Sequence, residues 1–248
     1  MPVKPGCREG VFDAMSTDDF AGKDGLKNPG PGFGGSMKSD YPDDSWFWPI
    51  LDEYRDGKGR TISEIDYPRW RLSPKPERQV NYQIQVINDH FGPTDCFSYF
   101  EFGVCFGTTF TQVLSWFPKA NGIGLEINPK RFEVAKWMVE RPFGGKNLAG
   151  RTRFHQIGFE DYPLSANSID VVFMDTNHQY PDEFNYIIRL LESGALRKNY
   201  LFLIDDPFHT GTDIARRRLI EERSDSLEIH TVGEWGLWWF KERDGGDA

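Results

Sequence analysis

From about residue 76 onward, stretches with hydrophobic residues at helical spacing alternate with short, continuous apolar runs. Val80, Ile84 and Ile87 recur at helical spacing and predict a helix over 76–90, which Gly92 and Pro93 end. The apolar runs are typical of buried strands and lie at Cys96–Phe100, Gly122–Leu125, Thr152–Gln156, Ile169–Met174 and Tyr200–Ile204. Strands that alternate with helices predict an α/β fold with a parallel sheet covered on both faces.

The pattern changes at the C-terminal end of the chain. Leu227–Val232 and Trp235–Phe240 are two strand-like runs joined by Gly233 and Glu234, which indicates a closing hairpin. We therefore expect a mainly parallel sheet with one antiparallel strand at its end.

Residues 1–75 do not continue this pattern, and we interpret them as an N-terminal extension of a domain that spans 76–248. The segment Asn28–Gly35 is rich in Gly and Pro and predicts a partly flexible arm. Aromatic residues cluster at Trp46–Leu51 and at Tyr67–Trp70. These clusters allow two interpretations: the extension docks its aromatic side chains on the domain, or it forms a lid over a ligand site.

Composition limits the partners and the compartment. The chain has 248 residues and a net charge of −9, which disfavours a nucleic acid as partner. The three cysteines, Cys7, Cys96 and Cys105, lack the number and spacing of a zinc cluster or a disulfide framework. Neither a membrane-spanning run nor a signal-peptide core is present, so we expect a cytoplasmic protein without a membrane partner. Homo-oligomer formation stays open.

The most informative stretch runs from Tyr99 to Asn128. A predicted strand leads into Glu101–Thr109, a helical pattern follows over 110–117, and the next strand ends at Glu126. Such a unit presents backbone N–H groups at a helix N-terminus and a carboxylate at the tip of the next strand. A dinucleotide site requires G-x-G-x-x-G, but Cys105 stands where the middle glycine belongs.

The pattern E-x-G-x-x-x-G-x-T instead resembles class I S-adenosylmethionine-dependent methyltransferases over about residues 76–242. The resemblance implies a Rossmann-like seven-stranded sheet. It also implies that the glycine loop holds the amino-acid end of the cofactor and that Glu126 takes both ribose hydroxyls. The candidate cofactor residues are Glu101, Gly103, Cys105, Gly107, Thr108, Thr109, Glu126, Ile127, Phe159, Glu160 and Asp175.

Two of these candidates follow the strand Thr152–Gln156, at a junction that borders the adenine in this family. Phe159 stands where an acid often follows the glycine. It is either a ring that stacks on adenine or a core residue, and Glu160 is a candidate acceptor for the adenine amino group.

Further carboxylates follow two later strands. Asp175 ends one predicted strand, and Asp205 and Asp206 end the next. Because ligands sit beyond the carboxyl ends of parallel strands, we expect these three side chains to converge. Crowded carboxylates repel one another, and a divalent cation, Mg²⁺ above all, resolves that repulsion.

The same residues resemble metal-dependent O-methyltransferases of the catechol and macrolide-sugar types. Asp175-Thr176-Asn177-His178 matches the Asp-x-x-His element of the second type, and Asp205-Asp206 matches a carboxylate pair. The resemblance implies a Mg²⁺-dependent O-methyltransferase acting on a hydroxyl of a small molecule, with sugars of secondary metabolites (natural product biosynthesis) or catechols as candidate acceptors. His178 is the expected general base.

Other interpretations stay open at this point. Asp205 or Asp206 could only cap the following segment, and His178 could lie outside the site, with His209 as a weaker candidate base. Among function classes, the alternatives are a nicotinamide-dependent oxidoreductase and a non-catalytic protein that binds S-adenosylmethionine.

Overall fold

The structure is a computed structural model that describes residues 51, 53–61, 77–141, 148–206, 208–232 and 237–243. The predicted aromatic clusters at 46–50 and 67–70 and the predicted turn at 233–234 lie outside these residues. In the described part of the extension, Tyr54 is buried, and its ring lies edge-on to that of Trp137 with the ring centroids 5.2 Å apart.

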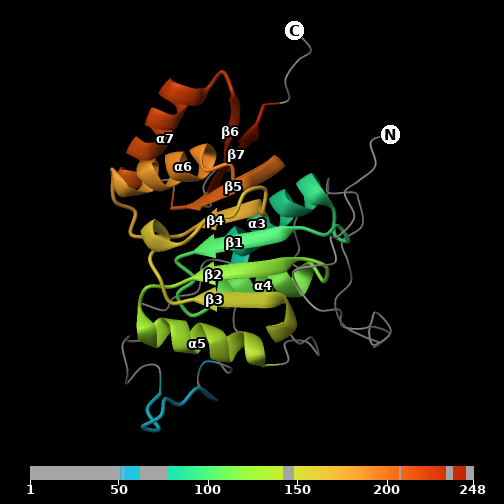
Figure 1. The fold of residues 1–248 in the computed structure, drawn as a ribbon, viewed down its shortest axis with the longest axis vertical. Coiled ribbons are helices and arrows are strands. Elements are labelled where there is room, and N and C mark those ends of the chain that lie inside the picture. Colours follow the sequence, from blue (N-terminus) through green and yellow to red (C-terminus); the bar gives the residue numbers. More distant parts are fainter. Residues whose placement is uncertain are drawn as a thin grey trace.

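A seven-stranded sheet in the order β3-β2-β1-β4-β5-β7-β6 forms the centre of the fold (Figure 1). Strands β1 to β5 pair in parallel, whereas β7 runs antiparallel to both β5 and β6. The strands are β1 (Ser98–Phe102), β2 (Asn121–Leu125), β3 (Thr152–His155), β4 (Ile169–Met174), β5 (Leu196–Asp205), β6 (Leu227–Val232) and β7 (Leu237–Glu242). The predicted mainly parallel sheet with one antiparallel strand is thereby confirmed.

Helices cover both faces of the sheet (Figure 1). One layer holds α3, α4 and α5, and the other holds α6 and α7. The helices are α3 (Glu77–Phe91), α4 (Thr108–Trp116), α5 (Pro129–Glu140), α6 (Asp182–Glu192) and α7 (Thr210–Arg223), with 3-10 turns at Ala149–Arg151 and Phe159–Asp161. None of these described helices is long and apolar enough to cross a membrane.

Each face of the sheet has its own apolar core because side chains alternate between the faces along each strand. On β4, Val171 and Phe173 pack towards the α3–α4–α5 layer, and Val172 and Met174 pack towards α6 and α7. All residues of β4 are buried, as expected for a central strand of a doubly covered sheet. The parallel strands therefore bring their carboxyl ends, and the polar residues that follow them, to one edge.

Cys96, which precedes β1, is disulfide-bonded. A single bond of this kind is less than the disulfide framework that the cysteine count disfavours.

Candidate functional site

The loop between β1 and α4 lies directly against the residue that follows β4. Gly103 has a φ of +87°, and its N–H donates to the carbonyl of Leu125 at 3.1 Å. A Cβ atom at this position would lie 1.6 Å from the carbonyl oxygen of Asp175. Only glycine permits both the backbone conformation and the contact. The glycine loop and Asp175 are therefore held side by side.

Replacing Gly103 with alanine is expected to lower the free energy of unfolding by at least about 2 kcal/mol, because strain at positive φ adds to displacement of backbone. Gly194→Ala is the matched control: Gly194 has a φ of +70°, but a Cβ there meets no atom within 4 Å. Urea unfolding measures the free energy of unfolding of both variants, and the difference between them separates the clash with Asp175 from the strain at positive φ. Equal decreases in the two variants would show that the close approach of Gly103 to Asp175 does not contribute to the loss of stability.

Glu126 is buried at the end of β2, with 5% of its surface exposed. Its Oε2 accepts the N–H of Cys105 and its Oε1 accepts the N–H of Asn128, each at 2.8 Å. Burial raises the pKa of the Glu126 carboxyl, although these two hydrogen bonds act in the opposite direction. The carboxylate thus ties the glycine loop to the start of α5, whose N-cap is Asn128.

Glu101, on β1, is held by a chain of buried hydrogen bonds. The hydroxyl of Tyr99 donates to Glu101 Oε2 at 2.6 Å, and Gln83 Nε2 on α3 donates to the same hydroxyl oxygen at 2.8 Å. Burial and the neighbouring charge of Glu101 raise the pKa of Tyr99 well above its ordinary value, so the phenol stays a neutral donor. The chain fixes where the Glu101 carboxylate lies.

The rest of the glycine loop forms the entry to α4. Cys105 and Gly107 both have positive φ, and Gly107 directly precedes the helix. Thr108 opens α4 with a partly exposed side chain, whereas Thr109 is buried. The loop therefore turns into a helix N-terminus, as the sequence predicts.

The residues expected near the adenine differ in burial: Phe159 is buried, whereas Glu160 and Ile127 are exposed. Phe159 is 5% exposed, stacks on Phe102 with ring centroids 4.6 Å apart, and carries the guanidinium of Arg189 over its ring. Because Phe102 and Arg189 lie against its ring, Phe159 fits the interpretation as a core residue better than that of a ring that stacks on adenine. Glu160 is exposed and accepts a hydrogen bond from the hydroxyl of Tyr186. Ile127, in contrast, is 72% exposed directly after Glu126.

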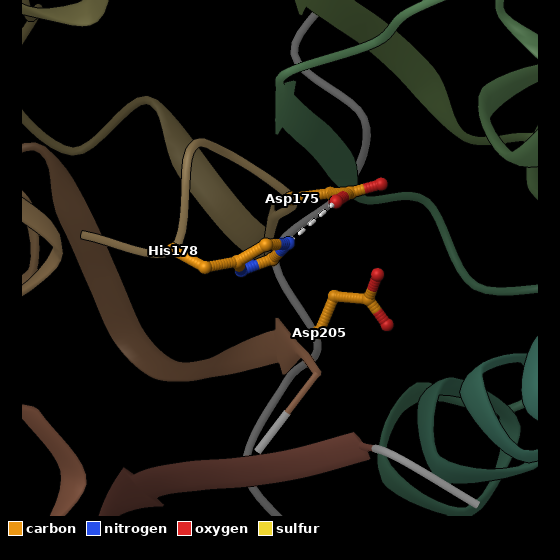
Figure 2. A group of neighbouring side chains, drawn as sticks. All are labelled: Asp175, His178 and Asp205. Atoms are coloured by element: carbon orange, nitrogen blue, oxygen red, sulfur yellow. Dashed lines mark ion pairs between the residues drawn. The ribbon is translucent and has the colours of Figure 1, made fainter. Parts of the chain in front are cut away.

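Asp175, His178 and Asp205 come together at the carboxyl ends of β4 and β5 (Figure 2). Among the described residues they form a group whose ligand atoms lie within 4.8 Å of one another, close enough to surround one ion. The Nε2 atom of His178 lies 3.5 Å from Asp175 Oδ1. Asp205 is almost fully buried, with 2% of its surface exposed.

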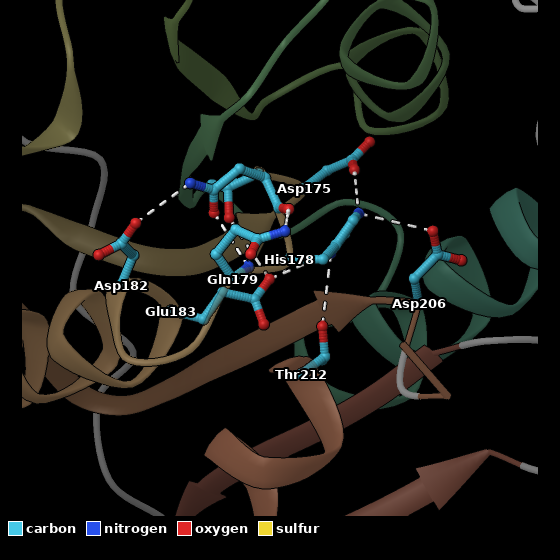
Figure 3. A network of polar contacts seen from close by, with 9 residues as sticks. Asp175, His178, Gln179, Asp182, Glu183, Asp206 and Thr212 are labelled. Atoms are coloured by element: carbon cyan, nitrogen blue, oxygen red, sulfur yellow. Dashed lines mark hydrogen bonds and ion pairs between the residues drawn. The ribbon is translucent and has the colours of Figure 1, made fainter. Parts of the chain in front are cut away.

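The other ring nitrogen of His178 faces α6 and α7 (Figure 3). Its Nδ1 lies 3.1 Å from Glu183 Oε1 and 3.4 Å from Thr212 Oγ1. Burial lowers the pKa of His178, but the hydrogen bonds and charges of Asp175 and Glu183 outweigh it and raise the pKa to about 10. Without a cation, the imidazole is therefore protonated at neutral pH.

The loop that carries His178 is fixed by close packing. His178 has a φ of +54°, and a Cβ atom on Gly211, in the first turn of α7, would lie 2.1 Å from the carbonyl oxygen of His178. Gly211 thus permits α7 to lie against this loop, which places Thr212 beside the imidazole.

Asp206 and His209 lie at the margin of this cluster. The side chain of Asp206 is 59% exposed, and its Oδ2 lies 3.5 Å from His178 Nε2 (Figure 3). The predicted metal ligands Asp175 and Asp205 share the compact group with His178, and Asp206 lies outside it. The ring of His209 is centred 5.3 Å from that of His178.

Sequence reasoning missed Glu183, Thr212 and Gln83. One signal for Glu183 was present: it precedes Ile187 and Leu190 by four and seven residues, so it occupies the apolar face of α6. An acid on such a face is buried and requires a partner. The sequence carries no comparable signal for Thr212.

Compared with known protein families and with curated proteins, the chain matches none. Solved structures do match. An S-adenosylmethionine-dependent methyltransferase from Aquifex aeolicus superposes with a TM-score of 0.50 at 15% identity, over 70% of this chain and 95% of that chain. A protein from Staphylococcus aureus, proposed to be a caffeoyl-CoA O-methyltransferase, gives 0.51 at 13% identity, over 66% and 82%.

Another match is cofactor-bound Rv0187 from MTB, with a TM-score of 0.50 at 18% identity, over 69% of this chain and 82% of that chain. Identities this low demonstrate a shared fold alone. The chain has the Rossmann-like fold of the class I S-adenosylmethionine-dependent methyltransferases.

Proposed function

We propose that this protein is an S-adenosylmethionine-dependent O-methyltransferase that acts on a hydroxyl of a small molecule and uses a divalent cation, Mg²⁺ first among candidates. One observation carries the proposal: the cluster of Asp175, His178 and Asp205 lies beside the glycine loop, because the Asp175 carbonyl packs on Gly103. A methyl donor held by that loop and an acceptor hydroxyl held by that cluster would be neighbours.

The residues around the loop fit the donor. The Glu126 carboxylate accepts backbone N–H groups, those of Cys105 and Asn128 among them, and a carboxylate has about four acceptor positions, so it retains capacity for ribose hydroxyls. Exposed Ile127 offers an apolar surface to an adenine. Glu101 and the N-terminus of α4 would bind the charged amino-acid end of the cofactor.

The donor set also fits a cation. Two carboxylates and one imidazole lie within 4.8 Å of one another, and carboxylate oxygens are the ligands that Mg²⁺ prefers. Asp175 and Asp205 would hold the ion, with Asp206 at its margin. Positive charge between them would relieve the repulsion of the clustered carboxylates.

When bound, the cofactor supplies an electrophilic methyl group, and the cation lowers the cost of negative charge on the acceptor oxygen. The residues of the protein position the donor and the acceptor and remove the proton of the acceptor hydroxyl. Nε2 of His178, which faces the cluster, takes the proton of the acceptor hydroxyl. The glycine loop, fixed by Glu126 and Gly103, would hold the donor, and the alignment of donor and acceptor would supply much of the rate.

Calorimetric titration tests the proposal against a nicotinamide-dependent oxidoreductase. We expect S-adenosylmethionine to bind and NAD to give no heat of binding, because Cys105 occupies the position where a pyrophosphate requires glycine. A screen of catechols and hydroxylated sugars for a gain of one methyl group then identifies acceptors. Binding of NAD in place of S-adenosylmethionine would refute the proposal, and cofactor binding without turnover of any acceptor would favour a non-catalytic binding protein.

Removal of divalent cations is expected to abolish turnover, since Asp175 and Asp205 would repel the charge that develops on the acceptor oxygen. Activity should vanish in EDTA and return with Mg²⁺. Asp205→Asn should raise the Mg²⁺ concentration needed for half-maximal activity at least about tenfold. Asp161→Asn, an exposed acid on the Phe159–Asp161 turn, is the matched control. Full turnover by a metal-free preparation would assign these carboxylates to the fold.

A further inference from the structure

A buried carboxylate on α6 contacts the imidazole on the side that faces away from the cluster. Glu183 is 0% exposed, and its Oε1 lies 3.1 Å from His178 Nδ1 (Figure 3). We propose that Glu183 is a positioning residue that holds Nδ1–H of His178 and thereby presents Nε2 to the acceptor. This inference rests on the proposed function of His178.

The hydrogen-bond geometry supports this orientation. Carboxylate oxygens act as hydrogen-bond acceptors, so the contact with Glu183 Oε1 favours a proton on Nδ1. Nε2 then lies towards the carboxylates of Asp175 and Asp206, 3.5 Å from each. A neutral imidazole has one donor and one acceptor nitrogen, and the 3.1 Å contact of Nδ1 with Glu183, shorter than the two 3.5 Å contacts of Nε2, favours the proton on Nδ1.

The fold alone gives little reason for this carboxylate. Glu183 Oε2 is buried without a hydrogen-bond partner in the described part of the chain, although Oε1 also receives the hydroxyl of Thr176 at 3.4 Å. Burying half a carboxylate in this way costs free energy. Asp182, next to it, already supplies a negative charge to the first turn of α6. The contact with His178 is what Glu183 adds.

The inference also explains the position of Thr212. Its hydroxyl lies 3.4 Å from Nδ1, on the same side of the ring as Glu183. Gly211 brings this turn of α7 against the His178 loop. Glu183 from α6 and Thr212 from α7 therefore both contact the Nδ1 side of the ring, opposite Nε2. Carboxylate partners of catalytic or metal-binding histidines generally act in this way, by fixing the tautomer and the ring orientation.

Nuclear magnetic resonance of the full chain with ¹⁵N-labelled histidine tests the inference directly. In the wild type we expect a slowly exchanging His178 ring proton, far downfield, that correlates with Nδ1, with or without Mg²⁺. His178→Asn assigns the signal by removing it. In Glu183→Gln and Glu183→Asp the proton should move upfield and exchange faster, because the charge-assisted hydrogen bond is lost or lengthened.

Asp182→Asn is the matched control. It removes a carboxylate from the same helical turn, but Asp182 accepts from Asn177 Nδ2 and does not contact His178. Its His178 signal should equal that of the wild type. An unprotonated Nδ1 in the wild type, or one unchanged signal in all Glu183 variants, would overturn the inference. The wild-type spectrum decides the first point even if a variant fails to fold.

Kinetics with an acceptor from the screen supply the second readout. Glu183→Gln should lower kcat by at least about tenfold. It should leave the Kd for S-adenosylmethionine within about twofold, because that cofactor is held from other strand ends. An unchanged kcat in Glu183→Gln would refute the positioning role while leaving the methyltransferase proposal intact. If no acceptor is turned over, the proposed function fails, and the spectra still decide whether Glu183 holds the ring.

Discussion

Replacing His178 with alanine is expected to lower kcat by about 10²–10⁴, the usual effect of losing a general base. The affinity for S-adenosylmethionine should hardly change, since most of the residues proposed to bind the cofactor lie at the ends of β1 and β2 and on the loop before α4. Turnover with an acceptor from the screen measures the first quantity, and calorimetry measures the second.

His209→Ala is the control for this variant, because His209 lies close by, with ring centroids 5.3 Å apart, on the loop that precedes α7. We expect it to keep most of the wild-type kcat. If His209→Ala lowered kcat and His178→Ala did not, His209 would be the base. If neither lowered kcat, no histidine of this cluster would accept the proton.

The pH dependence provides an independent measurement. The pKa of His178 is raised from 6.5 to about 10 in the folded chain without a cation. Proton binding at His178 therefore stabilises the fold fully below pH 6.5, and this contribution is lost as the pH rises through about 10. The free energy of unfolding of the metal-free wild type should fall across that window, and the fall should be smaller in His178→Ala.

A cation between the carboxylates would change this titration. It offsets the negative charge of Asp175, which is one cause of the raised pKa of His178. The pKa should then be lower, and kcat should rise with pH as the imidazole loses its proton. Metal-dependent turnover without such a rise would mean that His178 does not titrate in the reaction.

The strand ends of the site could be predicted from the sequence because they follow from hydrophobic pattern and strand direction. Glu101, Glu126, Asp175 and Asp205 each stand at the end of an apolar run, and parallel strands bring such positions to one edge. The glycine loop followed in the same way from its spacing.

Side-chain direction in the loops could not be predicted, since tertiary contacts decide it. His178 and Asp206 both adopt positive φ, at +54° and +46°, and the local sequence does not require this. The packing of Gly211 against His178 positions the imidazole, and Asp206 turns its carboxylate largely to solvent. Phe159 joins the core because the face of Phe102 is available to it.

Glu126 variants test the other half of the site. Glu126→Ala should weaken S-adenosylmethionine binding by about tenfold to a thousandfold, because hydrogen bonds to a charged group contribute roughly 1.5–3 kcal/mol each. The loss combines two effects. The ribose hydroxyls lose their acceptor, and the N–H groups of Cys105 and Asn128 lose theirs, which loosens the glycine loop.

Glu126→Gln separates these effects, since one amide oxygen still accepts and the second position becomes a donor. We expect an affinity between those of the wild type and Glu126→Ala. Glu140→Ala, an exposed acid at the end of α5, removes the same charge and should leave the Kd unchanged. Because burial raises the pKa of Glu126, wild-type affinity should decline on acidification at a higher pH than an exposed glutamate would require. Calorimetric titration across this pH range measures that decline. Equal affinities in all three variants and the wild type would show that the cofactor does not contact the end of β2.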